Sequence, residues 1–125
     1  MQISKQDVDQ RVEKKIFKSL YQVLADIKQP RAVEKFFDGI LTSTERVALA
    51  KRLAIAGYLK KNRSYEVIKN ELKVSSATIA TVQELLEQGN EGLITALKTI
   101  EADEWAEALT DKISAKIASW RKSFT

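Results

Sequence analysis

Lysine and arginine side chains gather in the middle of the chain. Eight of them lie between residues 44 and 73, against three acidic residues, so this stretch has a net charge of +5. Residues 74–111 reverse the balance, with eight acidic residues and one lysine. The whole chain has a formal charge of only +4. The middle of the chain is therefore predicted to offer a local surface to an anionic partner.

Two short amphipathic segments joined by a tight turn are predicted within residues 64–88. Ser64 can cap the first segment, which has barely two turns of apolar periodicity before a three-residue linker. Ser75 or Ser76 can cap the second, and Gly89 can end it in the left-handed conformation. The first of these helices is too short to be stable alone. This layout is typical of a helix-turn-helix.

The apolar residues of this motif have predicted roles in holding it together. They are Val67, Ile68 and Leu72 in the first helix, Val74 in the turn, and Ile79 and Val82 in the second helix. The N-terminal end of the second helix is the end that enters the major groove of DNA in such motifs. Small and hydroxyl residues there can contact phosphates or base edges, and nearby lysines and arginines can hold phosphates. We therefore predict double-stranded DNA as the partner, bound through Lys60, Lys61, Arg63, Lys69, Lys73, Ser75, Ser76, Ala77, Thr78 and Ala80.

The composition favours an all-α, multi-helix fold, because the chain has four Gly and one Pro and is 44% hydrophobic. At 125 residues it is expected to form a single domain, 1–125. A first helix is predicted from about Lys5 to Ile27, capped by Ser4 together with Asp7. A second is predicted to run from Pro30 through Ile40.

A third helix is predicted to follow a capping box formed by Thr42 and Glu45, and to end in the basic run at residues 60–63. Its predicted buried positions are Leu49, Leu53, Ala56 and Leu59 or Tyr58. Asn90 can cap the last region. The apolar periodicity there changes phase between Ile100 and Trp105, which predicts a kink or two separate helices.

The C-terminal region also predicts association of two copies. Its apolar residues recur at helical spacing: Trp105, Leu109, Ile113, Ile117 and Trp120. One small subunit is not expected to bury all of them. We interpret the two tryptophans as core or dimer contacts. An obligate homodimer follows as a hypothesis.

Several function classes are disfavoured by what the chain lacks. It has neither cysteine nor histidine, which removes thiol chemistry, the usual zinc ligands and the commonest general base. The acidic residues Glu101, Asp103, Glu104 and Glu107 suit a solvated helix face better than a metal or catalytic site. We therefore expect no catalysis, no metal and no cofactor. The polar start and the absence of a long apolar run predict a cytoplasmic protein without a membrane partner.

The stretch from about Phe37 to Leu86 resembles the tryptophan-repressor superfamily, especially its small bacterial relatives. The resemblance rests on Leu41-Thr42, Glu45-Arg46, Ala48-Leu49, Arg52, Lys69-Asn70-Glu71-Leu72 and Ala77-Thr78-Ile79. It implies an intertwined dimer in which each subunit presents one helix-turn-helix to half of a palindromic operator.

The departures from that family concern both the ligand and the bases. Arg52 matches the first of two arginines that grip the corepressor, but Thr81 stands at the position of the second. Arg52 and Thr78 remain candidate ligand-binding residues for an unidentified effector, and L-tryptophan is not the expected one. Glu66 replaces a base-contacting arginine of the family. The leading hypothesis is a DNA-binding transcriptional regulator.

Plainer interpretations remain open beside this one. Lys60, Lys61 and Arg63 could form an ordinary solvated helix end, and Arg52 could pair with a nearby acid or contact phosphate. The alternative function is a helical protein-interaction module that keeps the fold but has lost specific DNA binding. Glu84, Glu87 and the missing arginine at Thr81 favour that alternative.

Overall fold

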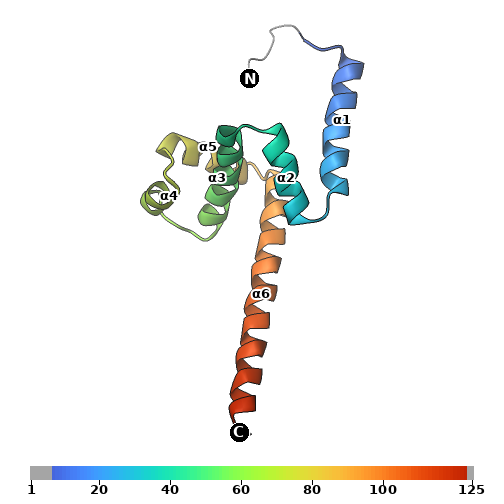
Figure 1. Cartoon of the computed structure of the whole chain (residues 1–125). Coiled ribbons are helices and arrows are strands. Elements are labelled where there is room, and N and C mark those ends of the chain that lie inside the picture. Colours follow the sequence, from blue (N-terminus) through green and yellow to red (C-terminus); the bar gives the residue numbers. More distant parts are fainter. Residues whose placement is uncertain (1–6, 124–125) are drawn as a thin grey trace. The chain divides into compact units, whose positions relative to one another are not determined.

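A computed structural model describes residues 7–123, and this range is all-α, as the composition predicted (Figure 1). Its helices are α1 (Gln10–Asp26), α2 (Pro30–Ile40), α3 (Ser43–Lys60), α4 (Tyr65–Leu72), α5 (Ser76–Glu87) and α6 (Glu91–Ser123). Of these helices, none combines the length and the apolar character needed to cross a membrane. Two compact units are distinguished, one ending at Val47 and one beginning at Ala48, and each is described by itself. The prediction of a single domain stays a prediction.

The first unit contains α1, α2 and the first turn of α3. The predicted start near Lys5 lies outside the described residues; within them α1 begins at Gln10 because Asp9 caps the helix, its Oδ1 accepting a hydrogen bond of 2.8 Å from the backbone N of Arg11. Asp7 precedes the helix, and the predicted Ser4 cap lies outside the described residues. Pro30 opens α2 as predicted, since proline needs no hydrogen-bond partner for its nitrogen at a helix start.

The capping box at the start of α3 is confirmed. The backbone N of Thr42 donates to Glu45 Oε1 at 2.8 Å, and the backbone N of Glu45 donates to Thr42 Oγ1 at 3.1 Å. Hydrogen bonds from the backbone and hydroxyl of Thr42 lower the pKa of Glu45. The stabilisation from this carboxylate is therefore present above its unfolded-state pKa and is lost as the pH falls through its lowered folded-state pKa.

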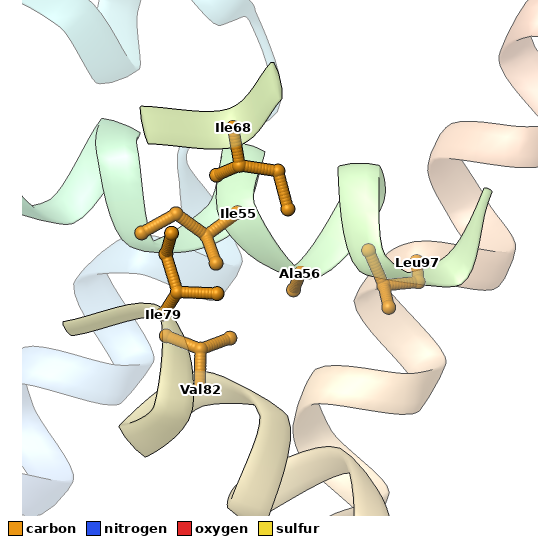
Figure 2. Packing of buried hydrophobic residues seen from close by; sticks show 6 residues of the cluster. All are labelled: Ile55, Ala56, Ile68, Ile79, Val82 and Leu97. Atoms are coloured by element: carbon orange, nitrogen blue, oxygen red, sulfur yellow. The ribbon is translucent and has the colours of Figure 1, made fainter. Parts of the chain in front are cut away.

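A small apolar core organises the second unit (Figure 2). The buried side chains are Ile55 and Ala56 of α3, Ile68 of α4, Ile79 and Val82 of α5, and Leu97 of α6. Around them pack Tyr58, Leu59, Tyr65, Leu72, Val74, Leu86, Leu93 and Ile100. Four helices thus share one cluster, and the predictions for Ala56, Ile68, Ile79 and Val82 as core residues are confirmed.

Other core predictions were wrong. Leu49 and Leu53 are 51% and 40% exposed in the single chain, whereas Ile55, which the periodicity did not select, is fully buried. The reason is that α3 carries apolar residues on several sides, so spacing alone does not identify the buried face. Val67 is 37% exposed, since α4 turns only the face of Ile68 and Leu72 to the core.

The last helix is uninterrupted, so the predicted kink or break between Ile100 and Trp105 was wrong. The change of phase has another cause. Leu97 packs in the core, and eight residues later Trp105 lies about 80° further round the helix, on a different side. Trp105 and Trp120 are 68% and 64% exposed, so neither belongs to the core of this chain. Beyond the core α6 runs clear of α3, α4 and α5 (Figure 1).

Adjacent residues of α4 provide a matched test of this core. Ile68→Ala should lower the free energy of unfolding by about 2 to 5 kcal/mol, because it leaves a cavity among side chains of three other helices. Val67→Ala should change it by less than about 1 kcal/mol, because Val67 is largely outside the core. Urea unfolding followed by circular dichroism measures both. Equal losses would contradict the assigned core.

Candidate nucleic-acid interface

The helix-turn-helix is confirmed in its local geometry. Ser64 caps α4, its Oγ accepting from the backbone N of Val67 at 3.2 Å, and Ser75 caps α5, its Oγ accepting from the backbone N of Thr78 at 3.1 Å. Between them, Lys73 adopts the left-handed conformation with φ of 55°. This residue turns the chain from one helix into the next.

A lysine outside the motif holds that turn. Lys51 of α3 donates from Nζ to the backbone carbonyl of Lys73 at 3.2 Å. In the sequence, Lys51 stands out only as one of the eight basic residues of the middle stretch. No local pattern could identify its role, because the two residues are 22 positions apart.

Two tyrosine hydroxyls also tie the motif together. Tyr58 of α3 donates to Glu71 Oε2 of α4 at 2.6 Å, and this hydrogen bond raises the pKa of Tyr58. The Tyr65 hydroxyl donates to Gln83 Oε1, which joins α4 to α5. These bonds fix the orientation of both short helices relative to each other and to α3.

The outer surface of the motif carries most of the predicted DNA-binding residues. Lys69, Lys73, Ser75, Ser76, Ala77 and Ala80 are exposed, and Thr78 is half-buried. An open hollow of about 430 Å³ is lined by Tyr65, Glu66, Lys69, Asn70 and Ser76, and so lies where α4 meets the start of α5. Lysine, amide and hydroxyl groups there suit an anionic or polar ligand, whereas the Glu66 carboxylate opposes an anion.

The predicted hydroxyl residues are not equivalent. Ser75 Oγ is engaged in the cap and lies 2.9 Å from Thr78 Oγ1. Ser76 makes no side-chain hydrogen bond to any other residue that the structure describes, and it is exposed. Of the three, the Ser76 hydroxyl is therefore the most available to a ligand.

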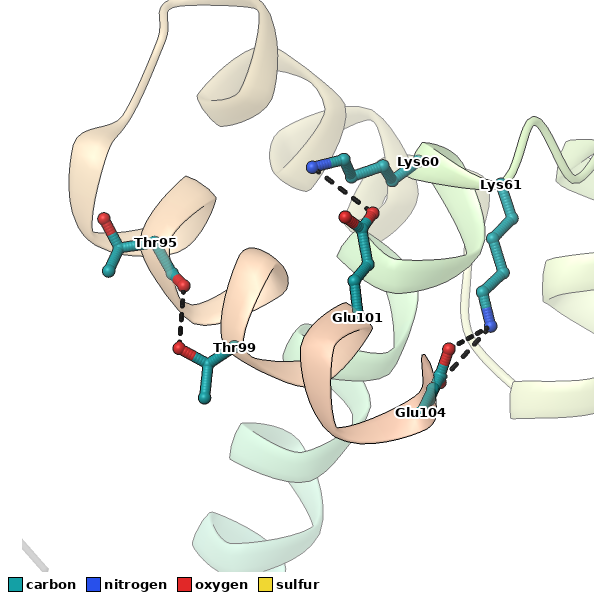
Figure 3. Close-up of polar contacts among 6 residues, drawn as sticks. All are labelled: Lys60, Lys61, Thr95, Thr99, Glu101 and Glu104. Carbon is teal, nitrogen blue, oxygen red and sulfur yellow. Dashed lines mark hydrogen bonds and ion pairs between the residues drawn. The ribbon is translucent and has the colours of Figure 1, made fainter. Parts of the chain in front are cut away.

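Two of the lysines predicted to bind phosphate lie beside carboxylates of α6 (Figure 3). Lys60 Nζ is 3.4 Å from Glu101 Oε1, and Lys61 Nζ is 3.3 Å from Glu104 Oε2. All four side chains are substantially exposed, so these ion pairs are weak and can exchange for other partners. Arg63 is exposed in the loop before α4.

The candidate ligand-binding residues offer few groups that could bind the carboxylate of an effector. Arg52 is exposed on α3, and α5 contains no lysine or arginine. Thr81 Oγ1 donates to the backbone carbonyl of Ala77, within its own helix, at 3.0 Å. Within residues 7–123 there is also no cluster of acidic side chains arranged to hold a metal ion.

Comparisons with known proteins agree with this architecture. Residues 15–101 match the family model described as Trp repressor protein. YerC of Bacillus subtilis (strain 168), described as uncharacterized, is 32% identical over 85 residues, or 68% of this chain and 82% of YerC. The crystal structure of a Staphylococcus aureus protein provisionally assigned as a Trp repressor has a TM-score of 0.66 at 26% identity, covering 74% of this chain and 96% of that one.

The two serines at the start of α5 allow a matched test of the site geometry. Ser75→Ala should lower the free energy of unfolding by about 1 kcal/mol, because it removes the cap of α5. Ser76→Ala should change it by less than about 0.5 kcal/mol, because Ser76 is an exposed first-turn residue. Chemical denaturation of the two variants decides the matter, and a larger loss for Ser76→Ala would show that the cap is misassigned.

Proposed function

Because the chain belongs to the Trp repressor protein family, we propose that it is a transcriptional regulator that binds double-stranded DNA through its helix-turn-helix. The observation that carries the proposal is the capped start of α5, exposed beside Lys69 and Lys73. Such a regulator would act in the cytoplasm and catalyse no reaction.

The residues of the motif divide into two roles. Arg63, Lys69 and Lys73 would hold phosphates, because they are exposed cations around the motif. The side chains that would face base edges are Ser76, Ala77, Thr78 and Ala80. Since α5 itself has no cation and three of these four side chains are very small, most of the affinity would be electrostatic and only weakly dependent on sequence.

Lys60 and Lys61 would contribute less than Lys69 and Lys73. To contact phosphate, they must first leave Glu101 and Glu104, whose carboxylates occupy their ammonium groups. Exchange of one weak ion pair for another yields little net free energy. Lys60 and Lys61 would therefore contact phosphate only after their side chains move away from these glutamates.

Two copies would be needed to read a palindromic operator, as the family resemblance implies. The exposed apolar residues of α6 support association of two copies, because one chain leaves them in water. A homodimer with one helix-turn-helix per subunit is accordingly part of the proposal.

A specific feature favours a second candidate function, a protein-interaction module without specific DNA binding. Glu66 lies in the hollow beside Lys69, and α5 carries Glu84 and Glu87 in place of any cation. Those carboxylates would repel phosphates. DNA titration separates the two functions, because only phosphate binding weakens steeply with salt.

The first test measures the affinity for duplex DNA at several salt concentrations. Lys69→Ala and Lys73→Ala should each weaken binding to all sequences alike and reduce the salt slope by about one unit, as expected for a lost phosphate contact. Lys60→Ala and Lys61→Ala should reduce the slope by less. Lys98→Ala, on α6, is the control of equal charge. Absence of salt-dependent binding by the native chain would favour the interaction module.

The second test concerns the effector. Free L-tryptophan should neither bind measurably nor change DNA affinity, because its carboxylate would find Arg52 at most, and α5 supplies no second cation. Loss of one member of a desolvated charge pair typically costs about 2 to 5 kcal/mol, enough to abolish a micromolar site. Calorimetry with millimolar L-tryptophan measures this. Saturable heat with tighter DNA binding would reverse the conclusion.

A further inference from the structure

In the part of α6 beyond the family match, the acidic residues come first and the basic residues follow. The match ends at residue 101, and α6 continues to Ser123. Residues 102–111 contain four acidic residues and no basic one, and residues 112–123 contain four basic residues and no acidic one. The acidic residues are Asp103, Glu104, Glu107 and Asp111, and the basic ones are Lys112, Lys116, Arg121 and Lys122.

The same segment carries an exposed apolar stripe. Its large members are 42 to 68% exposed: Trp105, Leu109, Ile113, Ile117 and Trp120. At about 100° per residue these positions occupy one sector of the helix, roughly 120° wide. Apart from Glu104, which pairs with Lys61 at the end of α3, this part of α6 runs clear of α3, α4 and α5 (Figure 1). The stripe is therefore suited to a second helix of similar length.

We propose that residues 102–123 pair with the same segment of a second copy in antiparallel orientation, with the midpoint near Ile113. Two identical helices in parallel would place acidic half beside acidic half and basic half beside basic half. In antiparallel orientation each acidic half lies beside the basic half of the other copy. The stripe also matches, because Leu109 then lies beside Ile117 of the second copy.

One edge of the stripe specifies this orientation. By helical geometry Asp103, Glu107 and Arg121 lie on the same edge. In an antiparallel pair with twofold symmetry, this edge of one helix faces the same edge of the other helix. Arg121 of each copy therefore lies near Asp103 and Glu107 of the other copy. Lys112 lies at the other edge and Lys116 falls within the stripe, so these lysines of the two copies approach each other near the midpoint and repel. The attraction thus comes from the edge that carries Arg121.

This pairing rests on the homodimer of the proposed function but not on its DNA binding, and its test contains no DNA. The native chain has no cysteine, so a single cysteine can carry a spin label in the full-length protein. Labels at Ser114→Cys, one residue from the midpoint, should lie close together in the pair. Labels at Ser123→Cys should lie about 30 Å further apart along the helix axis, because each is ten residues from the midpoint. Pulsed electron spin resonance measures both distances.

A charge exchange gives the second readout. In the protein labelled at Ser114→Cys, Arg121→Glu should raise the dissociation constant of the paired copies by at least about tenfold, because attraction becomes repulsion at two symmetric places. Lys122→Glu, with an equal change of charge on the opposite side of the helix, should alter it by less than about threefold. Asp103→Lys and Glu107→Lys combined with Arg121→Glu should restore pairing, which a merely structural role of Arg121 would not explain.

The outcomes are distinct. A short distance at Ser114, a long one at Ser123 and recovery in the triple variant support the antiparallel pair. Short distances at both positions would show parallel pairing. No short distance at Ser114 at 0.1 mM protein, about the concentration such spectra require, would show that the stripe does not pair with a second copy. Either result overturns the proposal, as does equal behaviour of Arg121→Glu and Lys122→Glu. Failure of the DNA titration would leave these distances unchanged.

Discussion

The helix-turn-helix depends on the packing of Ile55, Ile68, Ile79 and Val82. Helices of eight and twelve residues are too short to be stable in water by themselves. They persist because α3 offers Ile55 as a common contact, while Leu97 of α6 closes the same cluster. The orientation of the candidate interface follows first from this arrangement, because it determines which sides of α4 and α5 remain exposed.

Polar contacts complete the positioning that the small core begins. Lys51 holds the carbonyl at the turn, Tyr58 reaches Glu71 of α4, and Tyr65 joins α4 to α5. These bonds leave Lys69, Lys73 and Ser76 exposed, and Tyr65 itself lines the hollow between α4 and α5. Lysine and hydroxyl groups on the outer surface of the motif can therefore meet a phosphate backbone without disturbing the fold.

The last helix serves two different surfaces along its length. Up to Ile100 its apolar residues pack on the core, and the adjoining carboxylates of Glu101 and Glu104 pair with the end of α3. From Trp105 onward the apolar residues lie on another side and are exposed in the single chain. The boundary coincides with the end of the family match at residue 101. Self-association through the second surface would set the spacing between two helix-turn-helix motifs independently of their DNA contacts.

The sequence by itself determined the features that depend on neighbours three or four residues away. The Thr42 and Glu45 capping box, the caps at Ser64 and Asn90, Pro30 at the start of α2 and the left-handed Gly89 are all local, and all are present. For α5 the sequence offered Ser75 or Ser76 as the cap, and the structure has Ser75. Most of the helix boundaries and the position of the motif followed from them. Local rules suffice there because a cap is a hydrogen bond within one turn.

Only the tertiary structure decided which of several equivalent faces is buried and which charges meet. It selected Ile55 over Leu49 and Leu53, left Val67 exposed and kept α6 continuous. Packing among four helices makes that choice, and α3 alone presents apolar residues on too many sides to reveal it. It also brought Lys51 to the turn and placed Lys60 and Lys61 beside α6. Those contacts join residues 22 to 43 positions apart, and periodicity carries no information over such separations.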